Sequence, residues 1–304
     1  MSKVYVHNRT GGPETQELID RTIPQPGPGE LGVTVHAAAV NPMDWKIRSG
    51  LFGSQRDLPA PMGREVAGTV NGVGAGVDGF TVGDAILGPV SPDFGGFAED
   101  TIMVASDAVA KPEELSFIEA ATIPIAAATA YDGTHQIELT PGQTLLITGI
   151  GGGVGLMAAQ IGKVHEFRVI GTGSESKRTI VESTGATLVP SGDGLLSRLR
   201  TAAPDGVDLI LDLVGGDALR EVAELATSPE RIVSAADPTT AVQLGGTALV
   251  HTKEALTRIT SVIEYDLVDP HITATFSLAR AGEAIAAVEQ GHVTGKVVID
   301  MDLL

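Results

Sequence analysis

A glycine-rich segment in the middle of the chain, residues 148–155, has the composition of a loop that binds phosphate. It follows an apolar run, residues 144–148, that is typical of a buried strand, and a helix-forming run begins near Val154. Glycine permits a tight turn and lets the backbone approach a pyrophosphate closely, and a helix N-terminus offers N–H groups and partial positive charge. The lysine of a nucleotide triphosphatase loop is absent. The segment therefore predicts a dinucleotide site that begins at Gly149.

The residues after the next expected strand decide which dinucleotide fits. NAD-dependent proteins commonly place an acidic residue there, where it binds the ribose 2′-hydroxyl. Here the strand, residues 168–171, leads to Ser174, Lys177 and Arg178, whose polar and cationic groups suit a 2′-phosphate. Two alternatives stay open: Glu175 could bind the ribose, and Lys177 and Arg178 could form a solvated first helical turn. We expect NADPH rather than NADH.

The elements around these residues follow two patterns. Short valine-rich runs separated by Gly, Pro and Asp dominate the first third and predict β structure: residues 32–40, 65–73, 85–90 and 97–104. Strand and helix signals then alternate, which indicates βαβ units and a parallel sheet: residues 144–148, 154–164, 168–171, 177–184, 207–213 and 231–235. Ser116 and Glu119 have the spacing of a helix capping box. The end returns to β-like runs, residues 271–276 and 296–301, around a helix over residues 279–290.

This change of pattern predicts an α/β protein whose parallel sheet is inserted into a mostly-β domain. We expect the mostly-β domain at residues 1–119, the dinucleotide domain at 120–267, and a return to the first domain at 268–304.

Composition limits the classes of partner. The net charge is -18, which repels nucleic acid and anionic membrane surfaces. Cysteine is absent, so disulfides, thiolate nucleophiles and cysteine-ligated metals are excluded. The first residues carry no secretory signal, and no apolar stretch approaches the length of a membrane span. We expect a cytoplasmic protein that binds neither nucleic acid nor membranes.

Motifs along nearly the whole chain resemble the medium-chain dehydrogenase/reductase superfamily, in its zinc-independent quinone oxidoreductase (zeta-crystallin-like) branch. The resemblance is carried by residues 39–50, 61–68, 82–84, 95–99, 128–131, 212–216 and 291–298, together with the glycine loop. Asn41 stands where the zinc alcohol dehydrogenases carry their first cysteine ligand, and Arg64 stands where they carry a histidine. A guanidinium is not a normal metal ligand, so we expect no metal site.

The resemblance implies a Rossmann doubly wound sheet inserted in a GroES-like catalytic domain, a homodimer, and NADPH as cofactor. It places Asn41, Lys46 and Thr129 near the nicotinamide. It also implies that Lys296 reaches the cofactor, and that the other cofactor contacts come from Gly149, Gly152, Gly153, Val154, Ser174, Lys177 and Arg178.

Plainer roles compete with the catalytic ones. Asn41 could bond backbone groups in the turn at Pro42, and Lys46 could be a surface lysine. Tyr131 could donate a proton to the acceptor or pack in the core with its hydroxyl bonded to backbone. We expect Asn41, Lys46 and Tyr131 to be the catalytic candidates.

Without a metal to polarise an alcohol, hydride must go to an acceptor that is already electron-poor. The resemblance therefore implies reduction of a quinone or a similar conjugated carbonyl. Two alternatives remain at this point: a 2-enoyl thioester or alkenal reductase, and a non-catalytic NADPH-binding sensor or structural protein.

Overall fold

The computed structural model describes residues 1–51, 53, 57–291 and 293–303, and His292 of the closing motif lies outside this part. The chain divides into two compact units. The first unit comprises Met1–Ile125 and Ile272–Leu304, and the second comprises Ala126–His271. The domain boundaries expected from sequence, after residues 119 and 267, lie a few residues before the edges of these units.

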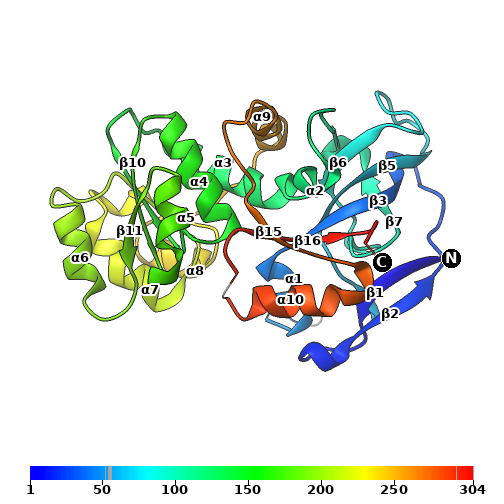
Figure 1. Cartoon of the computed structure of the whole chain (residues 1–304), viewed down its shortest axis with the longest axis horizontal. Helices are drawn as coiled ribbons and strands as arrows, with labels where there is room; N and C mark the ends of the chain where they lie inside the picture. Colours follow the sequence, from blue (N-terminus) through cyan, green and yellow to red (C-terminus); the bar gives the residue numbers. More distant parts are fainter. Residues whose placement is uncertain (52, 54–56, 292, 304) are drawn as a thin grey trace. The chain divides into compact units, whose positions relative to one another are not determined.

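The first unit is mostly β structure (Figure 1). Its smaller sheet has the order β2-β1-β4, from Gln16–Arg21, Ser2–His7 and Ala60–Pro61. Its larger sheet has the order β15-β16-β3-β5-β6-β8, with β7 paired to β3. The bounds of these strands are Ile272–Phe276, Lys296–Asp300, Glu30–Val40, Glu65–Val73, Ala85–Pro89, Val109–Ala110 and, for β7, Asp100–Val104.

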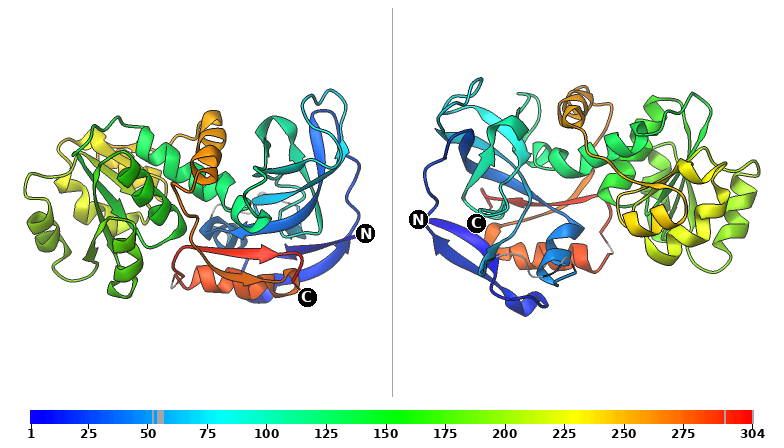
Figure 2. Two further views of the ribbon diagram at one scale, coloured as in Figure 1. Left: turned by 45° about the horizontal axis from the view of Figure 1, so that its top comes forward. Right: turned by 180° about the vertical axis from the view of Figure 1, so that it is seen from behind.

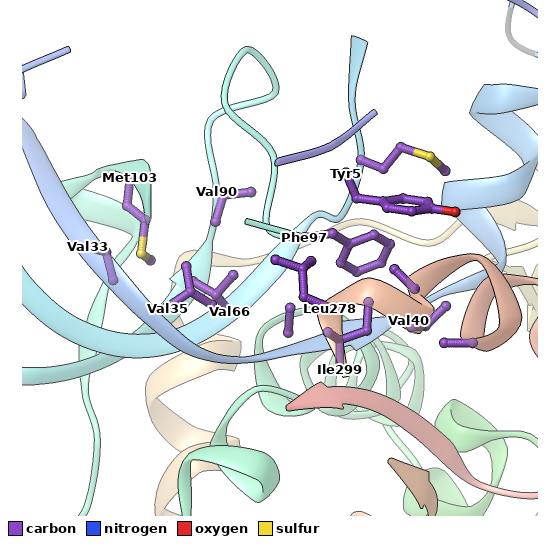
Figure 3. Packing of buried hydrophobic residues seen from close by; sticks show 14 of the residues in the cluster. Tyr5, Val33, Val35, Val40, Val66, Val90, Phe97, Met103, Leu278 and Ile299 are labelled. Atoms are coloured by element: carbon purple, nitrogen blue, oxygen red, sulfur yellow. The ribbon is translucent and has the colours of Figure 1, made fainter. Parts of the chain in front are cut away.

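Apolar residues of the larger sheet form the core of the first unit. Val35, Val66 and Phe97 are buried there together with Ile299 from the last strand (Figure 3). Because β16 pairs antiparallel with β3, the end of the chain completes a sheet that begins near residue 30. Burial on this sheet holds Lys296, the first residue of β16, close to the end of β3.

Three short α-helices belong to the first unit: α1 (Pro42–Arg48), α2 (Phe117–Ala120) and α10 (Ala281–Glu289). Ser116 caps α2, and the Glu119 carboxylate accepts the Ser116 N–H at 2.8 Å, so the capping box expected from sequence is confirmed. Helix α10 packs against α1, and the buried guanidinium of Arg48 donates to both oxygens of Glu289 at 2.8 Å.

The second unit contains a parallel sheet of the order β11-β10-β9-β12-β13-β14. With β9 as first strand this is the order 3-2-1-4-5-6 of the Rossmann fold, so the predicted fold class is confirmed. The strands are Thr187–Pro190, Arg168–Gly173, Thr144–Thr148, Leu209–Asp212, Ile232–Ser234 and Thr247–Ala248. Within this unit, helices pack on the sheet (Figure 2), namely α3 (Ala128–His135), α4 (Gly153–Val164), α5 (Arg178–Ser183), α6 (Leu195–Ala202), α7 (Gly216–Val222) and α8 (Pro238–Gln243). Helix α9 (Lys253–Glu264) packs against α3.

Among the described residues, no helix combines the length and apolarity that a membrane crossing requires.

Candidate functional site

The glycine loop connects β9 to α4 in the second unit. Gly149 has a φ of +68°, a left-handed conformation that favours glycine. A Cβ on Gly155 would lie 2.5 Å from the carbonyl oxygen of Ile150, so this position also requires glycine. Gly152 is the N-cap of α4, and the first N–H groups of a helix have no partner inside it. The amides of Gly153 and Val154 therefore form the start of an anion site, and a pyrophosphate fits this loop.

A buried carboxylate holds the loop and its neighbours in place. Asp212, at the end of β12, accepts from Thr148 Oγ1 at 2.7 Å and from Ser234 Oγ at 2.6 Å. It also accepts the backbone N–H groups of Val214 and Gly215 at 3.1 and 2.9 Å. Because Asp212 joins the ends of β9, β12 and β13, it fixes the edge of the sheet at which a dinucleotide binds in this fold. Asp212 belongs to the motif at residues 212–216, but the sequence does not reveal its role because Thr148 and Ser234 lie on other strands.

The expected 2′-phosphate residues lie after β10, in a less cationic setting than their sequence suggests. Arg178 is an ion-pair partner of Glu175, with Nε to Oε1 at 2.6 Å and Nη2 to Oε2 at 2.8 Å. Its Nη1 donates to Glu182 at 2.5 Å. Ser174 Oγ lies 2.9 Å from Ser176 Oγ, and both side chains are exposed. Glu175, the residue that competed for the ribose, therefore neutralises Arg178.

Lys177 lies against the glycine loop itself. A Cβ on Gly151 would lie 2.3 Å from Lys177 Cδ, so the lysine stem crosses the loop where no side chain stands. Partial burial lowers the pKa of the Lys177 ammonium. The stem of a cationic residue therefore lies against the loop that is expected to bind phosphate.

Thr129 and Tyr131 lie on α3 of the second unit. Thr129 is buried, and Tyr131 is half-buried with its ring stacked on His135 at a centroid distance of 4.0 Å. His135 also meets His165 edge-on at 4.9 Å. Burial lowers the pKa of His135. The Tyr131 ring is therefore part of an aromatic row that runs from α3 to His165 at the end of α4.

A second polar cluster lies in the first unit, at the junction of β3, α1, β5 and β16. Lys296 Nζ donates to Asn41 Oδ1 at 2.7 Å, to Glu65 Oε1 at 3.2 Å and to the Val40 carbonyl at 3.3 Å. Asn41 Nδ2 donates to the same Glu65 oxygen at 2.7 Å. All these side chains are buried, so the ammonium and the carboxylate compensate each other and orient the amide between them.

Two further groups complete this cluster. The other oxygen of Glu65 accepts the backbone N–H of Ile125 at 2.6 Å. Asp44 Oδ2 accepts the backbone N–H of Asn41 at 2.8 Å, which fixes the start of α1. Burial raises the pKa of Asp44 to about 7, and the charge of Glu65 adds to the shift.

The structure thus joins Asn41 and Lys296 by a direct hydrogen bond, and it places Lys46 on α1, five residues after Asn41. Lys46 is half-buried, with its Nζ 5.9 Å from the centre of the Trp45 ring. Glu65 and Asp44 were missed as site residues. Both belonged to recognised motifs, but their partners lie far away in sequence: Glu65 and Lys296 are 231 residues apart.

Comparisons with known proteins match this arrangement. Residues 27–113 match the alcohol dehydrogenase GroES-like domain, and residues 184–299 match the model described as zinc-binding dehydrogenase. The quinone oxidoreductase of Rattus norvegicus is 31% identical over 289 residues, which cover 93% of this chain and 85% of that protein. The chain belongs to the quinone oxidoreductase branch of the medium-chain dehydrogenase/reductase superfamily.

Two other members of this superfamily extend the comparison. The NADPH-dependent alkenal/one oxidoreductase of Arabidopsis thaliana is 30% identical over 313 residues, with 98% of this chain and 79% of that protein covered. The solved quinone oxidoreductase from Coxiella burnetii has a TM-score of 0.91 and 28% identity, with 99% of both chains covered.

One matching family model is described as a zinc-binding dehydrogenase, but the described residues offer no set of zinc ligands. Among the described residues, no group of three or more His, Cys, Asp or Glu side chains could hold a metal ion. Arg64 is a neighbour of Glu65 at the position expected from sequence, and its guanidinium carries a positive charge that would repel a cation.

Proposed function

We propose that this chain is a zinc-independent, NADPH-dependent oxidoreductase that transfers hydride to a quinone or a similar conjugated carbonyl. The observation that carries the proposal is the glycine loop of the second unit, with its helix N-terminus and Lys177 beside it. The second support is the cluster of Asn41, Glu65 and Lys296, in which Lys296 and Glu65 hold the Asn41 amide by hydrogen bonds. The relatives named above act on quinones and on alkenals or enones, as their names state.

The chemistry divides between cofactor and protein. Bound NADPH supplies the hydride, and the chain supplies binding and orientation. The amides of Gly152, Gly153 and Val154 hold the pyrophosphate, with Gly149 shaping the turn, and Lys177 holds the 2′-phosphate. Ser174 contributes a hydroxyl to the same phosphate. Arg178 contributes less than Lys177, because two carboxylates already satisfy its guanidinium.

The side-chain amide of Asn41 is the group of the first unit that would contact the nicotinamide side of the reaction. Its Oδ1 and one Nδ2 hydrogen are engaged by Lys296 and Glu65, and the second Nδ2 hydrogen remains as a donor for the nicotinamide side of the reaction. Lys296 acts as a positioning residue, because three acceptors occupy its three N–H bonds. Lys46 and Thr129 are assigned to the nicotinamide by resemblance, and Tyr131 is the candidate proton donor to the acceptor.

A reductase of alkenals and enones is the second candidate, supported by the Arabidopsis thaliana relative. Both reactions deliver hydride to a conjugated acceptor, so they share the cofactor loop and the Asn41 cluster. They differ in the acceptor, and turnover measurements with quinones and with alkenals distinguish them.

We further propose a cytoplasmic homodimer. The strand β14 is at the edge of the parallel sheet, and Val242 and Val250 are exposed nearby. Pairing of two such edges would bury both valines. The net charge of -18 and the absence of cysteine fit the cytoplasm.

The test is oxidation of NADPH and NADH by the purified protein against quinones, alkenals and an enoyl-CoA. We expect turnover of quinones with NADPH that a metal chelator does not reduce. Faster turnover of alkenals or enoyl-CoA would move the assignment to the second candidate. Tight NADPH binding without turnover of any acceptor would overturn both and indicate a non-catalytic binding protein.

A further inference from the structure

Several buried side-chain polar atoms in the described part of the first unit have no hydrogen-bond partner. They include Asp44 Oδ1, Arg48 Nη1 and both side-chain amide atoms of Gln16. Asp44 and Arg48 are four residues apart and therefore lie on one side of α1. Unpaired buried donors and acceptors are rare in folded proteins, and a group of them indicates ordered internal water.

These atoms lie on neighbouring elements of the first unit. His7 and Asp44 line one small cavity, together with Ile47, Met62 and Arg64. Its room for water is about 10 Å³, close to what a single water requires. His7 pairs with Gln16 across β1 and β2, and a Cβ on Gly282 would lie 3.7 Å from Gln16 Oε1 and 2.4 Å from the Tyr5 hydroxyl. His7 thus lies with Asp44 at the cavity and opposite Gln16 in the sheet.

The two oxygens of Asp44 have different surroundings. Oδ2 accepts the Asn41 N–H, whereas Oδ1 is buried, unbonded, and belongs to a residue that lines the cavity. The side chain is 3% exposed. A proton on Oδ1 would have a water as its acceptor and would remove a buried negative charge.

The charged groups around Asp44 come from every element packed on it. Glu65 on β5 raises its pKa, while Lys296 on β16 and Arg64 before β5 lower it, and burial is the largest cause. Arg48 on α1 and His7 on β1 complete the set. Since Glu65 and Lys296 already compensate each other, ionised Asp44 would be a second carboxylate around one ammonium.

We propose that Asp44 is an internal proton-exchange group, reached through ordered water beneath α1, and that its protonation state sets the position of Asn41. Neutral Asp44 leaves Lys296 on Asn41 and Glu65. Ionised Asp44 repels Glu65 and competes for Lys296, which loosens the Asn41 amide. Asp44 is a positioning residue, and its effect on turnover rests on the proposed function.

The first experiment requires no activity. Carboxyl carbons of aspartate are labelled with ¹³C and followed by NMR from pH 4 to pH 9. One resonance should titrate near pH 7, disappear in Asp44→Asn and persist in the matched exposed control Asp78→Asn. Water-selective NOE peaks should also reach the Gln16 side-chain amide protons. No aspartate titrating above about pH 5.5 in the wild type would overturn the proposal, whether or not the variant folds.

The second experiment measures the pH profile of kcat/KM with NADPH and a quinone. A group with a midpoint near 7 loses about tenfold in its protonated fraction between pH 6 and pH 8, so kcat/KM should fall by up to about tenfold. Asp44→Asn, which is permanently neutral, should stay nearly flat, and Asp78→Asn should follow the wild type. Superimposable wild-type and Asp44→Asn profiles would overturn the link to Asn41. If no acceptor turned over, the proposed function would fail while the NMR titration still tested Asp44.

Discussion

At the scale of single residues, Lys177 and Arg178 have different surroundings at the proposed phosphate end of the cofactor site. Lys177 crosses the loop at Gly151, whereas Arg178 is held by Glu175 and Glu182. The residue types alone do not distinguish the two cations. The Arg178 side chain can adopt several conformations, and the ion pair with Glu175 is one of them. The local pairing distinguishes them.

Lys177→Ala should raise KM for NADPH about 10- to 100-fold, because a charge-assisted hydrogen bond contributes about 1.5–3 kcal/mol. KM for NADH should change little, since NADH lacks the 2′-phosphate. Arg178→Ala is the matched control and should have a smaller effect on KM for NADPH. Equal losses for both cofactors would show that Lys177 does not recognise the 2′-phosphate.

Asp44 affects stability as well as the pH profile. Burial, its largest cause, raises the folded-state pKa from 3.8 to about 7. The folded chain therefore binds this proton more tightly than the unfolded chain, and that stabilisation is complete below about pH 4 and is lost as pH rises to about 7. The loss amounts to about 1.4 kcal/mol per pH unit.

Urea unfolding of wild type and Asp44→Asn between pH 4.5 and pH 8 isolates this contribution. The difference in unfolding free energy should drift in favour of the variant as pH rises towards 7 and then level off. A constant difference across this range would contradict a raised pKa.

At the scale of elements, the sequence predicts structure that depends on neighbouring residues. It does not predict pairing between residues that are far apart in the chain. The capping box at Ser116 and the strand–loop–helix at residues 144–164 depend on neighbours in sequence, and both are confirmed. Strands β1 and β2 were not expected, because their identity comes from pairing with each other and with β4. Glu65 and Asp212 were missed as site residues for the same reason, since their partners come from other strands.

The ion pair of Arg48 and Glu289 joins α1 to α10 and so supports the helix that carries Asp44. Arg48 is fully buried and Glu289 is partly exposed. Glu289→Gln leaves a buried guanidinium without its counter-charge and should lower the unfolding free energy by about 2–4 kcal/mol. Arg280→Gln, in a solvent-exposed pair with Glu283, should change the unfolding free energy far less in the same urea titration. A similar loss of unfolding free energy in Glu289→Gln and Arg280→Gln would contradict the role of buried Arg48 in joining α1 to α10.

Gly155 sets how closely α4 approaches the loop. A side chain there would meet the Ile150 backbone, which cannot move aside as a flexible side chain can. Gly155→Ala should therefore weaken NADPH binding by about tenfold or more, measured by fluorescence titration, because the helix must shift from the pyrophosphate. Gly142→Ala is the control for glycine replacement, since a Cβ there meets nothing within 4 Å, although its φ of +86° predicts some loss of stability. Unchanged binding in Gly155→Ala would show that the close packing does not position the loop.

At the scale of the whole molecule, the chain combines a GroES-like unit with a Rossmann unit, as its family does. The alternation of strand and helix signals in the sequence is sufficient to predict the α/β fold class. The order of the strands follows from the right-handed connections of parallel sheets rather than from any single residue.

In the proposed reaction, hydride passes from NADPH to a conjugated carbonyl without the help of zinc. The most direct measurement is kcat/KM for a quinone, using metal-depleted protein and NADPH deuterated at the transferred position. We predict that metal depletion leaves kcat/KM unchanged and that deuterium lowers it. Activity that disappears on metal depletion and returns with Zn²⁺ would contradict the account.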